Sequence, residues 1–219
     1  MSVVPVQLKR AGHWQPAVIR FGTETDVVRI SKWPDFLAAG AIGTGTAKES
    51  ADYAKDSVER WRKHLSRGRA AGTPKEYGDL IKANPKDDVA ILLVIEADWW
   101  APGDLLGFAY LRRTWADSIY MEFLAKHPLA AYKEPPDLNV TRVTEAMLVG
   151  ISSLMDQIEA PHRPTWAWWE ATAGSAAAYG EFFAPTTPCD LVIVSAKELS
   201  NCRNRIIHEI WPDKDLRVS

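Results

Sequence analysis

The stretch that decides the fold is DVAILLVIEADWWAPGDLLGFAYLRRTWADSIYMEFLA, residues 88–125. It opens with DVAILLVIEA, a continuous apolar run typical of a strand buried on both faces. A turn-like DWWAPGD follows, then LLGFAYLRR as a second strand and DSIYMEFLA as a third. Because only short turns separate the three runs, the sequence predicts an antiparallel meander. The third strand alternates, with one side carrying Ile119, Met121 and Phe123 and the other carrying Tyr120, Glu122 and Leu124.

Composition limits the classes of function. The chain has 219 residues, of which 47% are hydrophobic, so it can build a sizeable core. Its formal net charge of −2 gives no general attraction for nucleic acid or an anionic membrane. The first residues do not form a secretory signal, and no run of about 18 apolar residues is present to span a membrane. We therefore expect a cytoplasmic protein without membrane or nucleic-acid partners.

Metal and nucleotide motifs are not evident. Cys189 and Cys202 have neither metal-binding nor disulfide-framework spacing, and the five histidines are scattered, so we expect no metal site. The phrase GAIGTGTAKES is similar to a phosphate-binding Gly-x4-Gly-Lys-Ser/Thr loop. However, Thr46 stands where that loop requires lysine, and we interpret residues 34–50 as a flexible loop.

The N-terminal part predicts one strand region and two helices. The segment PAVIRFGTETDVVRISKW, residues 16–33, favours a strand or a hairpin around its Gly-Thr-Glu-Thr turn. Residues 48–66 have a helical period of apolar side chains. A shorter helix is expected in PKEYGDLIKAN, residues 74–84.

After the meander, the predicted elements alternate between helix and strand. The segment VTRVTEAMLVGISSLMDQIEA, residues 140–160, is expected to be a helix capped by Asn139 or Thr141. Its apolar stripe consists of Val143, Met147, Leu154 and Ile158. TWAWWEA is then a strand, GSAAAYGEFF a short helix and CDLVIVSA a last strand. The order from residue 88 is β-β-β-α-β-α-β, which indicates an α+β fold.

These segments and their order resemble the GNAT superfamily of acyl-CoA-dependent N-acyltransferases. The phrases that carry the resemblance are LLGFAYLRRTWADSIYMEFLAKHP, VGISSLMDQIEA and WEATAGSAAAYGEFF. The resemblance implies one domain with a central mixed, mostly antiparallel sheet flanked by helices. It would comprise a strand and helices over about 1–87, an acyl-CoA-binding core over about 88–196 and an extension over 197–219.

The resemblance also implies a binding site for acetyl-CoA or another acyl-CoA as co-substrate. The pantetheine arm would pair with the backbone of Phe123, Leu124 and Ala125, as an added strand would. The pyrophosphate would lie at a helix N-terminus formed by Thr141, Arg142, Val143 and Thr144. Ser175, the small polar residue beside the alanine run, is placed with them. The family's glycine-containing pyrophosphate loop is missing, so the anion would be held by a differently built loop with Lys126, Lys133 or Arg142.

By the same resemblance, Tyr179 would protonate the leaving thiolate as general acid. The alternative is a packed helix tyrosine. Glu122 and Glu170 are the general-base candidates, and the alternative for either is an ion pair with an arginine such as Arg112 or Arg113. Glu170 shares its strand face with Trp166 and Trp168, which allows an aromatic acceptor groove.

Two functions follow from the resemblance. The first is an N-acyltransferase that acts on an amine of a small molecule or peptide. The second is a catalytically inactive GNAT-like module that serves in binding or interaction. A homodimer is compatible with either function.

Overall fold

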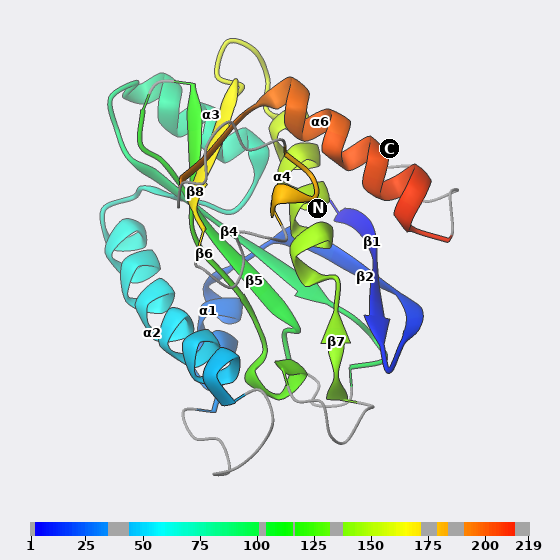
Figure 1. Ribbon diagram of the computed structural model, residues 1–219. Helices are drawn as coiled ribbons and strands as arrows, with labels where there is room; N and C mark the ends of the chain where they lie inside the picture. The colour runs from blue at the N-terminus through cyan, green and yellow to red at the C-terminus, as the bar shows by residue number, and fades with distance from the viewer. Residues whose placement is uncertain are drawn as a thin grey trace.

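The computed structural model describes residues 3–34, 44–100, 104–115, 117–131, 138–171, 179–183 and 191–212. The arrangement of its elements is drawn in Figure 1. The strands are β1 (Val3–Arg10), β2 (His13–Phe21), β3 (Ala70–Ala71), β4 (Val89–Glu96), β5 (Gly107–Arg113), β6 (Ser118–Lys126), β7 (Val140–Thr141), β8 (Trp166–Glu170) and β9 (Leu191–Ser195). The helices are α1 (Glu24–Ile30), α2 (Thr44–Ser66), α3 (Pro74–Ala83), α4 (Val143–Gln157) and α6 (Ala196–Arg205), with short turns η1 (Pro128–Ala131) and η3 (Ile206–Ile210).

All the described strands belong to one mixed sheet, in the order β7-β1-β2-β4-β5-β6-β8-β9, with β3 beside β4. Most neighbours are antiparallel, and the parallel pairs are β6 with β8 and β3 with β4. The meander β4-β5-β6 is confirmed, and β8 lies beside β6 and parallel to it because α4 makes the crossover between them. The α+β class, with a mostly antiparallel sheet flanked by helices, is therefore as expected.

A β-bulge interrupts the regular alternation of β6. Tyr110 pairs with Phe123 but the next residue of β5, Leu111, pairs with Met121, so Glu122 is the extra residue. Phe123 consequently faces the same side as Tyr110 and does not share the side of Ile119 and Met121. The expected grouping of Phe123 with those two residues is wrong, because strict alternation assumes an unbroken ladder.

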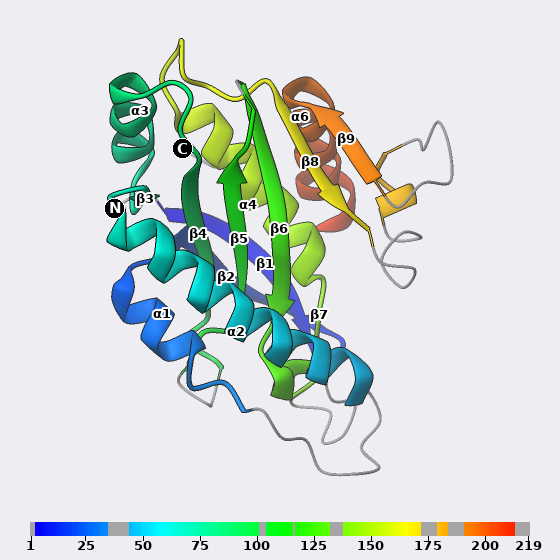
Figure 2. The same ribbon diagram turned by 90° about the vertical axis from the view of Figure 1, so that its left-hand side faces the viewer.

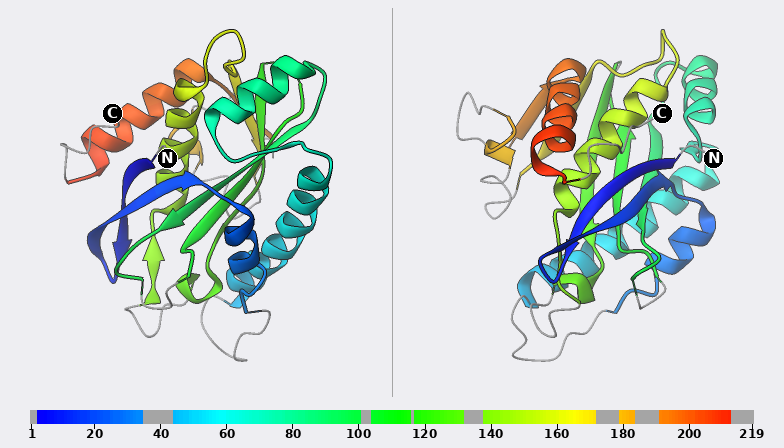
Figure 3. Two further views of the ribbon diagram at one scale, coloured as in Figure 1. Left: turned by 180° about the vertical axis from the view of Figure 1, so that it is seen from behind. Right: turned by 90° about the vertical axis from the view of Figure 1, so that its right-hand side faces the viewer.

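The two faces of the sheet carry separate layers of helix. α2 crosses one face with α1 beside it, and α4 covers the other face together with α6 (Figures 2 and 3). The core under α4 contains Met147 and Leu154, as the helical stripe predicts. The core under α2 contains Ala54, Val58 and Trp61. None of the helices in the described ranges is long and apolar enough to cross a membrane.

The N-terminal hairpin differs from the expected one. β1 and β2 pair across a turn at Ala11 and Gly12, which both have positive φ, 47° and 84°. The expected strand is present, because residues 16–21 belong to β2, but the alternative of a hairpin around residues 22–25 is wrong. Those residues start α1, where Thr23 and Asp26 form a capping box. The β-branched residues of DVVRI favour a strand, but this segment packs as helix α1. The expected loop over 34–50 is also wrong in part, since α2 begins at Thr44; residues 35–43 lie outside the described residues.

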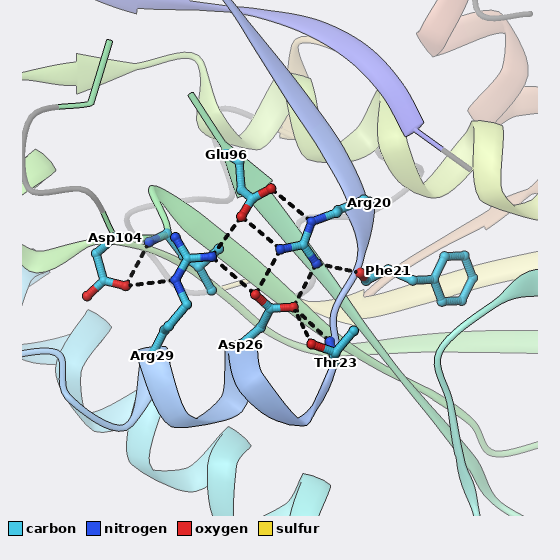
Figure 4. A network of polar contacts seen from close by, with 8 residues as sticks. Arg20, Phe21, Thr23, Asp26, Arg29, Glu96 and Asp104 are labelled. Carbon is cyan, nitrogen blue, oxygen red and sulfur yellow. Dashed lines mark hydrogen bonds and ion pairs between the residues drawn. The ribbon is translucent and has the colours of Figure 1, made fainter. Parts of the chain in front are cut away.

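A network of ion pairs fastens α1 to the sheet (Figure 4). Arg20 of β2 lies 2.7 Å from both the Asp26 carboxylate of α1 and the Glu96 carboxylate of β4. Arg29 bridges Glu96 at 2.7 Å and Asp104 at 3.4 Å. Burial raises the pKa of the Asp26 carboxyl, but the hydrogen bonds from Arg20 and Thr23 and the charge of Arg20 together bring it below its ordinary value. Hydrogen bonds from Arg20 and Arg29 likewise lower the pKa of Glu96, so the Asp26 and Glu96 carboxylates are held in charged form.

The start of α4 is also different from the expectation. Its N-cap is Arg142, with φ 69° and ψ 21°, and the Arg142 side chain makes no capping hydrogen bond. Asn139 and Thr141 are therefore not the cap, and Thr141 belongs to β7, which pairs with β1. The chain turns into α4 through a left-handed backbone conformation that glycine usually adopts.

Candidate functional site

The candidate site is a cleft where β6 and β8 part. The two strands pair from Ser118 with Trp166 to Met121 with Trp169, and the pairing ends there. The cleft beyond this point has a volume of about 640 Å³. Its lining comes from α2, β6, β7, α4, β8 and Tyr179: Glu49, Ser50, Tyr53, Met121, Glu122, Leu124, Ala125, Lys126, Val140, Thr141, Arg142, Val143, Thr144, Glu145, Glu170 and Tyr179.

Most of the residues predicted from sequence meet in this cleft. The three catalytic candidates line it together with Leu124, Ala125 and the segment 141–144. The side chain of Phe123 does not line it; because of the bulge, the Phe123 ring packs on Tyr53 with ring centroids 5.3 Å apart. Ser175 and Lys133 lie outside the described residues. A larger cavity of about 790 Å³ lies between α3 and the end of α4, and no predicted site residue lines it.

Beyond Met121, one edge of β6 is unpaired. Residues 123–126 pair with Gly107–Tyr110 of β5 on one side. On the cleft side, none of the described strands continues the pairing. A strand edge of this kind presents free N–H and C=O groups, which an extended ligand can pair with.

The start of α4 forms one end of the cleft. The first N–H groups of a helix have no intrahelical partner, and the Arg142 side chain does not cap them. Two cations lie nearby: Lys126 donates a hydrogen bond from Nζ to the Val140 carbonyl at 2.9 Å, and Arg142 pairs with Glu145 at 2.5 Å. Burial lowers the pKa of Lys126. These groups fit a diphosphate in part, because the Glu145 carboxylate already engages Arg142 at the helix end.

Tyr179 lies on the α4 side of the cleft. Its side chain is 5% exposed and its ring lies 5.1 Å from that of Trp169. Burial first, and then the negative charge of Glu145, raise the pKa of Tyr179 to about 12. The phenol therefore keeps its proton at neutral pH, as a general acid must. Of the short helix predicted over 174–183, residues 174–178 lie outside the described residues.

Glu122 is bound by two arginines. Its side chain is 8% exposed, its carboxylate contacts Arg60 of α2, and its Oε2 lies 2.7 Å from Nε of Arg112. Glu122 therefore has an arginine partner, which was the expected alternative to a general-base role, and Arg112 is one of the two partners named for it. Arg113 instead donates to the carbonyls of Pro85 and Asp87, at 2.6 and 3.1 Å.

Glu170 is exposed and shares its strand face with Trp166 and Trp168, as the period of two predicts. Trp168 stacks on Tyr120, with centroids 3.9 Å apart, and on Trp115, at 4.9 Å. Burial, followed by the charge of Glu170, raises the pKa of Tyr120. No cation in the described part of the chain pairs with Glu170, so its carboxylate is open to the cleft.

Four lining residues with polar side chains were not predicted: Glu49, Ser50, Tyr53 and Glu145. The Tyr53 hydroxyl donates to Glu49 Oε1 at 2.8 Å. Helical periodicity identifies only the buried stripe of α2, and these two residues flank that stripe, so no sequence signal singled them out. Glu145 stands at the third helical position of α4, where an acidic residue is ordinary. No group of three metal-ligating side chains occurs among the described residues.

No protein-family model and no curated relative matches the sequence. Among solved structures, the chain is similar to a protein assigned to the GNAT family of acetyltransferases from Desulfovibrio desulfuricans, with 11% identity, TM-score 0.39, and 76% of this chain and 81% of that one covered. It is also similar to the PaiA N-acetyltransferase of Thermoplasma acidophilum in complex with coenzyme A, with 13% identity, TM-score 0.38, and 81% and 96% covered. A third is a nourseothricin acetyltransferase, with 14% identity, TM-score 0.32, and 49% and 65% covered. These likenesses concern the fold alone.

Proposed function

We propose that the chain is an N-acyltransferase that transfers an acetyl or other acyl group from acyl-CoA to an amine of a small molecule or peptide. The observation that carries the proposal is the convergence in one cleft of an unpaired strand edge, an uncapped helix start and a buried, protonated Tyr179. These three features suit the three parts of a thioester ligand: an extended amide arm, an anion and a leaving sulfur. Cytoplasmic location and a homodimeric state stay predictions of the same proposal.

Acyl-CoA would bind along β6 and at the start of α4. The backbone of Phe123, Leu124 and Ala125 would pair with the pantetheine amides. The phosphates would lie near residues 141–144, with Lys126 and Arg142 as the cations. Arg142 would then exchange its Glu145 partner for a phosphate, which accepts a bidentate guanidinium equally well. Ser175 is proposed as a further contact.

In the reaction, the neutral amine attacks the thioester carbonyl carbon, a C–N bond forms and the C–S bond breaks. Tyr179 donates its proton to the departing sulfur. The proton released from the nitrogen passes to a carboxylate, directly or through water. Glu170 suits this step better than Glu122, because Glu170 has no cation partner in the described ranges whereas Arg60 and Arg112 stabilise the charge of Glu122. Both stay general-base candidates.

The second candidate function is a GNAT-like module that binds without turnover. One observation favours this second function. The Glu145 carboxylate pairs with the Arg142 guanidinium at the start of α4, and its negative charge would repel a diphosphate there. The absence of glycine between β6 and α4 acts in the same direction, since a side chain limits how closely a phosphate approaches the backbone.

Two measurements separate the two functions. Binding of acetyl-CoA and longer acyl-CoAs should raise the melting temperature of the native protein by mass action, with desulfo-CoA as a ligand that retains the phosphates but lacks the thiol. Release of free thiol from acetyl-CoA in the presence of amines or peptides tests turnover. A higher melting temperature with acyl-CoA but no release of thiol supports the binding module. If no acyl-CoA raises the melting temperature, the enzyme proposal is refuted.

A further inference from the structure

The cleft has two walls of different charge. One wall is formed by α4, β7 and the end of β6 and carries the cations Lys126 and Arg142 together with Tyr179; its one carboxylate among the described residues, Glu145, is paired with Arg142. The opposite wall is formed by α2 and the outer faces of β6 and β8, and carries Glu49, Glu122 and Glu170. If acyl-CoA lies along the cationic wall, the acceptor has to approach from the acidic one.

The carboxylates of the acidic wall differ in their partners. Glu122 is neutralised by Arg60 and Arg112. Glu49 accepts a hydrogen bond from Tyr53, and no cation in the described part of the chain pairs with it. Lys48, its neighbour on α2, pairs with Asp52 at 3.0 Å. With Glu170, the acidic wall therefore has two carboxylates without a counter-charge.

Tyr53 fixes the position of Glu49. Burial, the hydrogen bond to Glu49 and the charge of Glu49 together raise the pKa of Tyr53 to about 12, so the phenol remains a donor. The Tyr53 ring is itself held against Phe123 in the core under α2. Glu49 is thus a positioned carboxylate within the cleft. The face of an aromatic ring beside it also favours a cation.

We infer that the acceptor carries a second positive charge besides the reacting amine, and that Glu49 binds this second cation while Glu170 receives the proton of the reacting one. The inference rests on the proposed function and names its substrate class: diamines, or larger molecules with two separated amino groups. An acceptor with one amino group uses a single carboxylate and leaves Glu49 unpaired. An acceptor with a carboxylate at that place is repelled.

The test compares three acceptors of equal chain length: 1,4-diaminobutane, n-butylamine and 4-aminobutyrate. Thiol release from acetyl-CoA is measured at neutral pH against acceptor concentration. We expect kcat/KM to be about fivefold higher for the diamine than for n-butylamine, the upper range for an ion pair with an exposed carboxylate, and lowest for 4-aminobutyrate. Added salt should reduce the difference by screening the charges.

Glu49→Gln should raise KM for the diamine to the level of n-butylamine, because the carboxylate that binds the second cation is removed. Tyr53→Phe should reduce the same preference in part, because it removes the hydroxyl that positions Glu49. Glu159→Gln, an exposed glutamate that does not line the cleft, is the matched control and should retain the full preference.

Other outcomes overturn the inference and leave the proposed function standing: equal kcat/KM for diamine and monoamine, or a diamine preference that survives in Glu49→Gln. If acyl-CoA binds but no amine is acylated, calorimetry measures the binding of 1,4-diaminobutane to the CoA-bound native protein. Binding that does not depend on Glu49, or no binding, overturns the inference. Failure of the proposed function itself is recognised separately, because acyl-CoA would then not raise the melting temperature of the native protein.

Discussion

Acid should destabilise the protein through one buried histidine. His127 follows β6 and is 3% exposed. Its ring lies between those of Trp33 and Trp100, with centroid distances of 5.0 and 5.6 Å. Its Nδ1 accepts a hydrogen bond from the backbone N–H of Leu129 at 3.2 Å, so the ring is neutral at that atom. Burial lowers the pKa of His127 to about 4, and the charge of Asp104 opposes this only slightly.

The magnitude follows from linkage. The pKa of His127 is about 4 in the folded state and 6.5 in the unfolded chain. Between these values the unfolded state binds a proton that the folded state does not, so the free energy of unfolding falls as pH is lowered. Each pH unit costs about 1.4 kcal/mol. The loss begins near pH 6.5, is complete near pH 4 and totals about 3 kcal/mol for this residue.

The assay is urea unfolding of the native protein and of His127→Asn at a series of pH values. Asparagine places a neutral acceptor near the position of Nδ1 but does not titrate. The variant should therefore start less stable and lose about 3 kcal/mol less between pH 6.5 and 4, while the carboxylate pairs of both proteins titrate alike. If both proteins lose stability in parallel over this window, His127 is protonated in the fold and the reasoning is refuted.

Four substitutions test the cleft and its supports. Tyr179→Phe should reduce kcat about a hundredfold with little change in KM, because it removes the acid and leaves the ring packing; an unchanged kcat would return Tyr179 to a packing role. Arg142→Glu should weaken acyl-CoA binding about tenfold or more by replacing attraction with repulsion, as measured by thermal shift. Glu122→Gln should lower the free energy of unfolding by about 1–3 kcal/mol in urea titration, because it leaves two arginines short of their partner. Gly150→Ala should cost about 1–3 kcal/mol in the same measurement, since the added Cβ would lie 2.8 Å from Cδ1 of Ile19.

The elements that sequence reasoning predicted well are those with long, uniform patterns. The continuous apolar run of β4 and the apolar stripe of α4 each reflect burial along a whole element. Such patterns can be recognised in the sequence before the tertiary structure is known. The order strand, helix, strand in the sequence also agrees with the parallel placement of β8 beside β6, because α4 makes the crossover between them. The N-terminal hairpin was missed because β1 pairs with β2 through a turn at Ala11, which is not a typical turn residue.

The candidate site was predicted from family resemblance, and its chemistry was predicted incompletely. Tyr179 and Glu170 could be proposed because each follows a recognisable segment. The role of Glu122 could not be predicted in the same way, because its partner Arg60 lies 62 residues away in sequence and only the packing of α2 on β6 brings the two together. Glu49 and Tyr53 lie on the flank of α2, where periodicity indicates solvent and not a cleft.

The bulge at Glu122 connects the fold to the proposed chemistry. Pairing of β6 with β8 ends at Met121, the residue directly before the bulge, and a bulge bends its strand. The extra residue turns both Glu122 and Phe123 toward α2, where Arg60 binds the carboxylate and its guanidinium lies 5.1 Å from the Phe123 ring. The same segment therefore opens the strand edge on one side and anchors α2 on the other. Since α2 carries Glu49 and Tyr53, a change at the bulge should alter the acceptor wall and the acyl-CoA edge together.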